Sequence, residues 1–161
     1  MKHLILMRHA KSDWSMNLDD HARGLNKRGE RSARALGDWL RAQEYLPDQV
    51  LCSDAHRTRQ TLELLALEAE TDFDPRLYLS APETMLEVLR GATGDRVLMI
   101  AHNPGICALA EHLVDEAPAH DRFADYPTGA TLVAEFDIDD WKKLRPGTGR
   151  ALAFVVPREL T

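Results

Sequence analysis

The chain has 161 residues, which is long enough for one domain with a hydrophobic core and too short for two ordinary domains. Hydrophobic residues make up 44% of the chain and charged residues 29%, a balance typical of soluble globular proteins that excludes disordered and fibrous classes. The formal net charge of −6 argues against a broad surface for nucleic acid or for an anionic membrane. We therefore expect a single domain over residues 1–161, with neither nucleic acid nor membrane as a partner.

Short apolar runs alternate with segments of helical periodicity, which predicts an α/β fold with a mostly parallel sheet. Residues 2–7 predict the first strand, and a polar loop over 11–24 leads to a helix that Asn26 caps. The buried face of this helix is expected to hold Ala33, Leu36, Trp39 and Leu40, and Pro47 marks its end. A second strand over 49–53 precedes a helix from about Ala55. The buried stripe of that helix is expected to hold Leu62, Leu65, Ala66 and Ala69.

The second half of the chain continues the alternation. Residues 71–74 predict a short third strand, and Pro82 starts a helix that carries Met85, Leu86 and Leu89. Residues 96–101 form the clearest interior strand, and Pro104 and Gly105 open an apolar helix that runs through Leu113. Residues 130–136 and 151–156 predict two final strands, which we expect to pair as an antiparallel edge.

Two cysteines, Cys52 and Cys107, form no C-x-x-C motif and no framework of short spacings. Both are expected to be small buried residues in a reducing compartment. The N-terminus has only four consecutive apolar residues, far fewer than a signal sequence or a spanning helix needs, and no later stretch approaches the length of a spanning helix. These observations predict a cytoplasmic protein.

Polar residues follow three of the predicted strands. The strand ends carry Arg8 and His9, then Arg57 within residues 53–61, and then His102 and Asn103. If the strands are parallel, their carboxyl ends meet at one edge of the sheet, where helix N-termini favour anions. Guanidinium groups there can bind a phosphate with paired donors, and a neutral imidazole can act as a nucleophile.

These three clusters resemble the successive motifs of the histidine phosphatase superfamily, which is phosphoglycerate mutase-like. Their order in the chain is that of the family. Residues 23–29 resemble a further segment of the family pattern, and Thr128-Gly129 resembles its late Thr-Gly step. The resemblance implies a three-layer α/β/α sandwich whose mostly parallel sheet has an antiparallel edge. It also implies that His9 accepts the phosphoryl group, that Arg8 and Arg57 bind its oxygens, and that His102 donates to a nonbridging oxygen.

Several other residues have weaker candidate roles. Arg23 is either the partner of Asp19 or Asp20 in an ion pair or a substrate contact, and Asn103 is a candidate substrate contact. Asn26 is most simply an N-cap. The remaining histidines are expected to be surface or packing residues, with His56 a candidate for the rim of the site: His3, His21, His56, His112 and His120.

Other phosphatase chemistries fit the residues less well. Cys52 to Arg57 is one residue shorter than the C-x5-R loop of cysteine phosphatases, and Cys52 falls within a predicted strand. Residues 133–139 resemble the start of an aspartate-nucleophile phosphatase but lie too close to the C-terminus for the remaining motifs of that family. No metal-ligand spacing is present, so we expect no metal and no cofactor.

A general acid is missing from the expected place. Many members of the superfamily have a glutamate after the third strand to protonate an alkoxide leaving group, and here Leu79 stands near that position. Glu83 is the possible acid, although a carboxylate in the first turn of a helix is also favoured by the helix dipole alone. The segment between Arg57 and His102 is too short for a lid-like insertion. Residues 8–14 resemble the first motif of the SixA-like phosphohistidine phosphatases, a branch that is also compact.

We therefore expect a phosphatase that acts through a phosphohistidine intermediate on His9. The predicted substrate is phosphohistidine on a protein, such as a phosphotransfer domain, because imidazole leaves more readily than an alkoxide. The alternative within enzymes is a phosphomonoesterase for a small metabolite. The alternative from another class is a phosphate-binding module without turnover, which would need the arginines but not His9.

Overall fold

A computed structural model describes residues 1–161 and contains one six-stranded sheet in the order β3-β2-β4-β1-β5-β6. The strands are β1 (Lys2–Arg8), β2 (Gln49–Cys52), β3 (Glu70–Phe73), β4 (Arg96–Ala101), β5 (Thr131–Phe136) and β6 (Arg150–Val155). Strands β1 to β4 are parallel, whereas β5 is antiparallel to both β1 and β6. The predicted parallel sheet with an antiparallel edge is confirmed.

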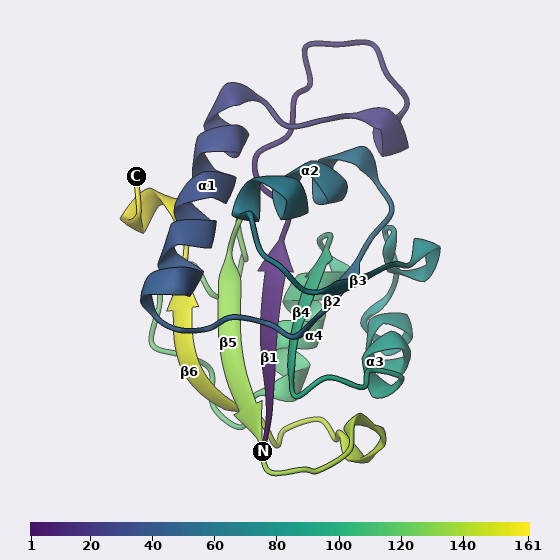
Figure 1. Ribbon diagram of the computed structural model, residues 1–161, viewed down its shortest axis with the longest axis vertical. Coiled ribbons are helices and arrows are strands. Elements are labelled where there is room, and N and C mark those ends of the chain that lie inside the picture. Colours follow the sequence, from purple (N-terminus) through teal and green to yellow (C-terminus); the bar gives the residue numbers. More distant parts are fainter.

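Four helices cover the two faces of this sheet. They are α1 (Lys27–Ala42), α2 (His56–Leu65), α3 (Pro82–Arg90) and α4 (Gly105–Leu113). Helices α1 and α2 lie in front of the sheet in Figure 1, and α3 and α4 lie behind it, which confirms the three-layer sandwich. Short 3-10 turns are η1 (Asp20–Ala22), η2 (Pro75–Leu77), η3 (Trp141–Lys143) and η4 (Pro157–Glu159). None of the helices combines the length and the apolar character that crossing a membrane requires.

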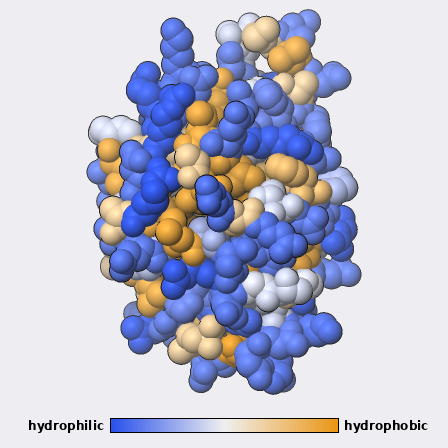
Figure 2. Space-filling view, viewed as in Figure 1, coloured by the Kyte–Doolittle hydropathy of each residue, from blue (hydrophilic) through white to orange (hydrophobic).

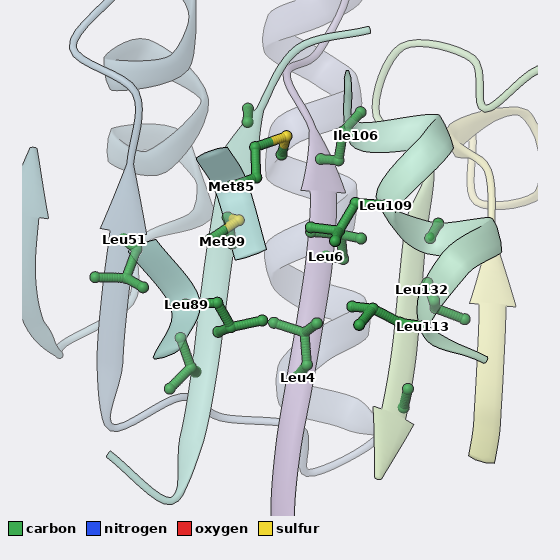
Figure 3. Close-up of a cluster of buried hydrophobic side chains, with 14 of the residues drawn as sticks. Leu4, Leu6, Leu51, Met85, Leu89, Met99, Ile106, Leu109, Leu113 and Leu132 are labelled. Atoms are coloured by element: carbon green, nitrogen blue, oxygen red, sulfur yellow. The ribbon is translucent and has the colours of Figure 1, made fainter. Parts of the chain in front are cut away.

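The central strand β1 contributes to both hydrophobic cores because alternate side chains of a strand point to opposite faces. Leu4 and Leu6 belong to the larger core, beneath α3 and α4, and Ile5 and Met7 belong to the core beneath α1 and α2. Figure 3 shows the larger core, where side chains from α3 and α4 meet Leu4 and Leu6. These four side chains of β1 are fully buried.

The predicted elements and the observed ones differ mainly at their ends. Helix α2 stops at Leu65, so the predicted continuation of its buried stripe through Ala66 and Ala69 is wrong. Ala66 adopts a left-handed conformation with φ of 55°, and Arg41 of α1 donates to the carbonyl oxygens of Leu65 and Ala66. The side chain of Arg41 therefore satisfies carbonyl groups that a longer helix would have bonded internally.

Other boundaries shift by a residue or two. Ser53 lies beyond β2, β3 begins at Glu70, and the last two strands begin or end one residue away from the expected positions. Helix α1 ends at Ala42, five residues before Pro47, and Trp39 is only partly buried on it. The Asn26 side chain accepts from the Gly29 N–H at 2.8 Å, which confirms the predicted N-cap.

Candidate active site

The parallel strands β1, β2 and β4 bring the three polar clusters to one edge of the sheet. Arg8 is the last residue of β1, Arg57 lies in the first turn of α2, and His102 directly follows β4. The rings of His9 and His102 have centroids 5.3 Å apart and an interplanar angle of 52°. Only 5% of His9, 2% of Arg57 and 2% of His102 is exposed. The structure thus gathers the residues that the sequence motifs single out.

The His9 ring is held in one tautomer by the backbone. Its Nδ1 lies 2.7 Å from the carbonyl oxygen of Ala10, and because a carbonyl only accepts, Nδ1 carries the proton. In the neutral ring the lone pair is therefore on Nε2. The Gly129 N–H also donates to the His9 carbonyl oxygen at 2.8 Å, which fixes the backbone that carries the ring. This geometry leaves Nε2 available as a nucleophile.

Burial keeps His9 neutral. It lowers the pKa of His9 to about 3, and the charges of Arg8 and Arg57 contribute in the same direction. Loss of solvent contact is the larger cause, and the arginine charges are the smaller one. Burial and Arg57 likewise lower the pKa of His102 to about 3. Both rings are therefore uncharged at neutral pH.

We expect the His9 ring to remain neutral when the solution is acidified to pH 5. An ordinary histidine with a pKa near 6.5 would be about 97% protonated at that pH, whereas His9 would be about 1% protonated. Nitrogen-15 NMR of the imidazole rings between pH 8 and pH 5 measures this directly, and it also reports the Nδ1–H tautomer. A protonation midpoint of His9 near 6.5 would contradict the buried, neutral nucleophile.

Three buried nitrogen atoms in the site have no hydrogen-bond partner within the protein. They are the Nε of Arg8, the Nε of Arg57 and the Nδ1 of His102. The other ring nitrogen of His102, Nε2, lies 2.8 Å from the Ser53 hydroxyl. When that hydroxyl donates to Nε2, Nδ1 carries the proton and is a buried donor without a partner. Buried donors without partners are costly, so a cluster of them favours a bound acceptor such as phosphate.

The motif residues around the site form its scaffold. Thr61 accepts from the Ala10 N–H at 3.1 Å and donates to the Arg57 carbonyl at 2.8 Å, so it links the loop after β1 to α2. Thr58 donates to the carbonyl oxygens of Ser53 and Ala55, both at 2.8 Å. Thr58 and Thr61 therefore hold the backbone that carries His9 and Arg57 in place.

Two residues of the site were not predicted from the sequence. The Asp20 carboxylate pairs with Arg57 Nη2 at 3.0 Å and accepts from the Tyr78 hydroxyl at 2.5 Å. The Tyr78 ring packs edge-on against His102, with centroids 5.4 Å apart. Both residues lie in connecting segments, where apolar periodicity carries no signal. The spacing of Asp20 and Arg23 is a local clue, because it allows an ion pair across one turn.

Arg23 and Asn103 form hydrogen bonds to other groups of the protein. Arg23 donates to Asp20 Oδ1 through Nη2 at 3.0 Å and to the Ser12 hydroxyl at 2.8 Å, so the ion-pair alternative describes its observed partners. Its guanidinium carbon also lies 3.4 Å from the ring centroid of Trp14. The Asn103 amide donates to the carbonyl oxygens of Asp125 and Tyr126, at 3.2 and 3.0 Å.

Glu83 and Leu79 are the two positions where a general acid was sought, and they lie in different surroundings. Glu83 lines a small cavity of about 150 Å³ between α3 and α4, together with His112 and Pro146, and no residue of the arginine–histidine cluster lines that cavity. Leu79 is 53% exposed and has a left-handed φ of 50°. Neither position supplies a carboxyl group beside His9.

Cysteine chemistry does not fit the site. Cys52 lies within β2 and is fully buried, and its thiol donates to the Ser53 carbonyl at 3.3 Å. Burial raises the pKa of this thiol to about 12, so the nucleophilic thiolate does not form near neutral pH. No group of three or more His, Cys, Asp or Glu side chains is arranged to hold a metal ion.

The fold and its cation-lined edge place the chain among the α/β proteins that bind phosphoryl groups. Residues 4–78 match the model of the histidine phosphatase superfamily (branch 1). An uncharacterized protein of Mycobacterium tuberculosis is 38% identical over 160 residues, which cover 94% of this chain and 100% of that protein. The chain belongs to the histidine phosphatase superfamily.

Two solved structures share this architecture. A candidate phosphohistidine phosphatase SixA from Nakamurella multipartitia superposes with a TM-score of 0.87 and 29% identity, over 97% of this chain and 96% of that one. A candidate phosphohistidine phosphatase SixA from Agrobacterium tumefaciens gives a TM-score of 0.80 and 25% identity, over 97% and 98% of the two chains. The structural similarity therefore extends beyond residues 4–78, which match the family model, to nearly the whole chain.

Proposed function

We propose that the protein is a phosphohistidine phosphatase that removes phosphoryl groups from histidine side chains of another protein. The observation that carries the proposal is the neutral His9 ring with a free Nε2, which packs 5.3 Å from the His102 ring in a site that contains three buried, unpartnered nitrogen atoms. A module that only bound phosphate would need those donors but would have no use for a desolvated nucleophile with a fixed tautomer. The similarity to two candidate phosphohistidine phosphatases supports the same assignment.

The proposed reaction has two steps. In the first, His9 Nε2 forms a bond to phosphorus while the bond from phosphorus to the substrate imidazole breaks, and the released nitrogen of the substrate ring takes a proton from solvent water. In the second, water attacks the phosphorus and gives up a proton to solvent, the bond to His9 Nε2 breaks so that its electron pair returns to the ring, and inorganic phosphate is released. Arg8, Arg57 and His102 stabilise the negative charge on the equatorial oxygens in both steps.

The surroundings of the site favour phosphohistidine over an alkyl phosphate. Transfer from one imidazole to another exchanges one nitrogen–phosphorus bond for a similar one, so it does not require a strong acid. An alkyl phosphate instead releases an alkoxide, which needs a proton in the transition state. Asp20, the carboxylate in the site, is paired with Arg23, Arg57 and Tyr78, and the exposed Leu79 has no proton to give.

The test compares kcat/KM for a phosphohistidine protein, p-nitrophenyl phosphate and glycerol phosphate. We expect the phosphohistidine protein to be the best substrate, the aryl ester with its good leaving group to be intermediate, and the alkyl ester to be the poorest. The His9→Ala variant measures the spontaneous loss of the labile phosphoryl group. A kcat/KM for glycerol phosphate above that for phosphohistidine would contradict the proposal and favour a metabolite phosphomonoesterase.

A further inference from the structure

We propose that Asp20 and Tyr78, here called the buttress, are positioning residues that aim Arg57 and His102 at the transferring phosphoryl group. The two residues of the buttress meet where η1 contacts the segment before α3. Nothing in the proposed chemistry uses either side chain directly. The inference rests on the proposed phosphate site but not on the identity of the substrate.

Asp20 holds the outer end of the Arg57 guanidinium. Arg57 Nη1 donates to the Asp20 backbone carbonyl at 2.7 Å, and Nη2 donates to its carboxylate at 3.0 Å. The Nε of Arg57 keeps no partner. A carboxylate that stood in the place of the phosphate would be expected to satisfy Nε as well. Asp20 instead fixes the guanidinium from the side and leaves the Nε edge free for substrate.

Tyr78 connects the same carboxylate to His102. The Tyr78 hydroxyl donates to Asp20 Oδ2, the oxygen that also pairs with Arg57. The Tyr78 ring meets His102 edge-on at an interplanar angle of 87°, and its centroid also lies 4.8 Å from that of the His21 ring. The ring is therefore held in place and in turn limits the orientation of His102. One carboxylate thus aligns two of the donors that face the phosphate.

Asp20 is expected to have opposite effects on phosphate binding and on catalysis. Partial burial opposes ionisation, but hydrogen bonds from Tyr78, Arg23 and Arg57 hold the pKa of Asp20 well below its usual range. The carboxylate stays negative at neutral pH and repels a bound phosphate. Its alignment of Arg57 and His102 favours the transition state, in which charge spreads over the equatorial oxygens.

The test compares two ligands of the Asp20→Asn variant by calorimetry. Inorganic phosphate represents the ground state, and orthovanadate adopts a five-coordinate geometry that resembles the transition state. We expect the variant to bind orthovanadate at least about tenfold more weakly, while inorganic phosphate binds as tightly as before or more tightly. A residue that only stabilised the fold would weaken both ligands together.

Two further variants complete the test. Tyr78→Phe removes only the hydroxyl, keeps both arginine ion pairs, and is expected to lower vanadate affinity selectively by a smaller factor even if Asp20→Asn fails to fold. Asp19→Asn is the matched control, because Asp19 is exposed and its side chain makes no capping hydrogen bond. Equal losses for the two ligands, or no change in either, would overturn the proposal. Wild-type protein that binds vanadate but leaves phosphohistidine intact would instead refute the proposed function.

Discussion

The His9→Ala variant is expected to form no phosphoryl adduct and to lose at least about 10⁴-fold in turnover, because removing a nucleophile eliminates the covalent route. In wild-type protein, brief incubation with a labelled phosphohistidine protein and acid-free quenching should trap a phosphoryl group on His9. That adduct should be labile to acid and stable to alkali, as expected for a phosphorus–nitrogen bond. Mass spectrometry of peptides prepared under alkaline conditions identifies the modified residue.

His102→Ala is the matched comparison for this experiment. His102 lies in the same site and has a similarly low exposure, but its proposed role is to donate a hydrogen bond, so the adduct should form slowly and still appear on His9. Thermal unfolding of each variant verifies that it is folded. Adduct that persists at the wild-type level in His9→Ala would contradict the assigned nucleophile.

The second large effect is expected for Arg57→Ala, which should lower kcat by about 10²–10³-fold, the usual loss when one donor to a developing anion is removed. Arg57 is 2% exposed and keeps a buried, unpartnered Nε, so its interaction with a phosphoryl group is weakly screened by solvent. Arg57→Lys should recover little of this activity, because an ammonium group cannot bond Asp20 through two nitrogens and the phosphate through a third.

Arg59→Ala provides the control for this prediction. Arg59 lies on the same helix as Arg57 but is exposed, where it bonds to the Asp54 carbonyl at 3.0 Å and lies over the Phe73 ring. Its kcat should therefore stay within about twofold of the wild-type value, as for most exposed substitutions. An Arg57→Ala variant with near-normal kcat would exclude Arg57 from the binding of the transferring group.

The residues that follow strands were predictable from the sequence because the sheet itself places them. Once β1, β2 and β4 are recognised as parallel, their carboxyl ends must meet, and Arg8, His9, Arg57 and His102 follow from that geometry. The alternation of apolar and helical segments is strong enough to define the strands and helices to within a few residues.

The buttress was not predictable in this way. Asp20 lies 37 residues from Arg57 and 58 residues from Tyr78, and both it and Tyr78 belong to segments without apolar periodicity. Their contacts depend on how two connecting segments pack over the sheet edge, which no local pattern specifies. The end of α2 has a similar cause, since Arg41 from another helix caps its carbonyl groups.

The loop before Asp20 exposes several large apolar side chains. Trp14, Met16 and Leu18 are 71%, 60% and 45% exposed, and Leu79 is exposed beside Tyr78. Apolar surface is visible at the top of the molecule in Figure 2, where Figure 1 places this loop. Single exposed apolar residues are common, but several together beside a site are typical of contact surfaces.

The position of β1 has a consequence for how the site behaves over time. Its core residues are buried on both faces and paired with β4 on one side and β5 on the other, so its amide hydrogens should exchange with solvent only when the whole molecule unfolds. His9 follows this strand directly, whereas Asp20 belongs to a short 3-10 turn with no buried residue. The nucleophile is therefore anchored next to the part of the molecule that is expected to exchange most slowly, whereas the amide hydrogens of the unburied turn that carries Asp20 are expected to exchange faster.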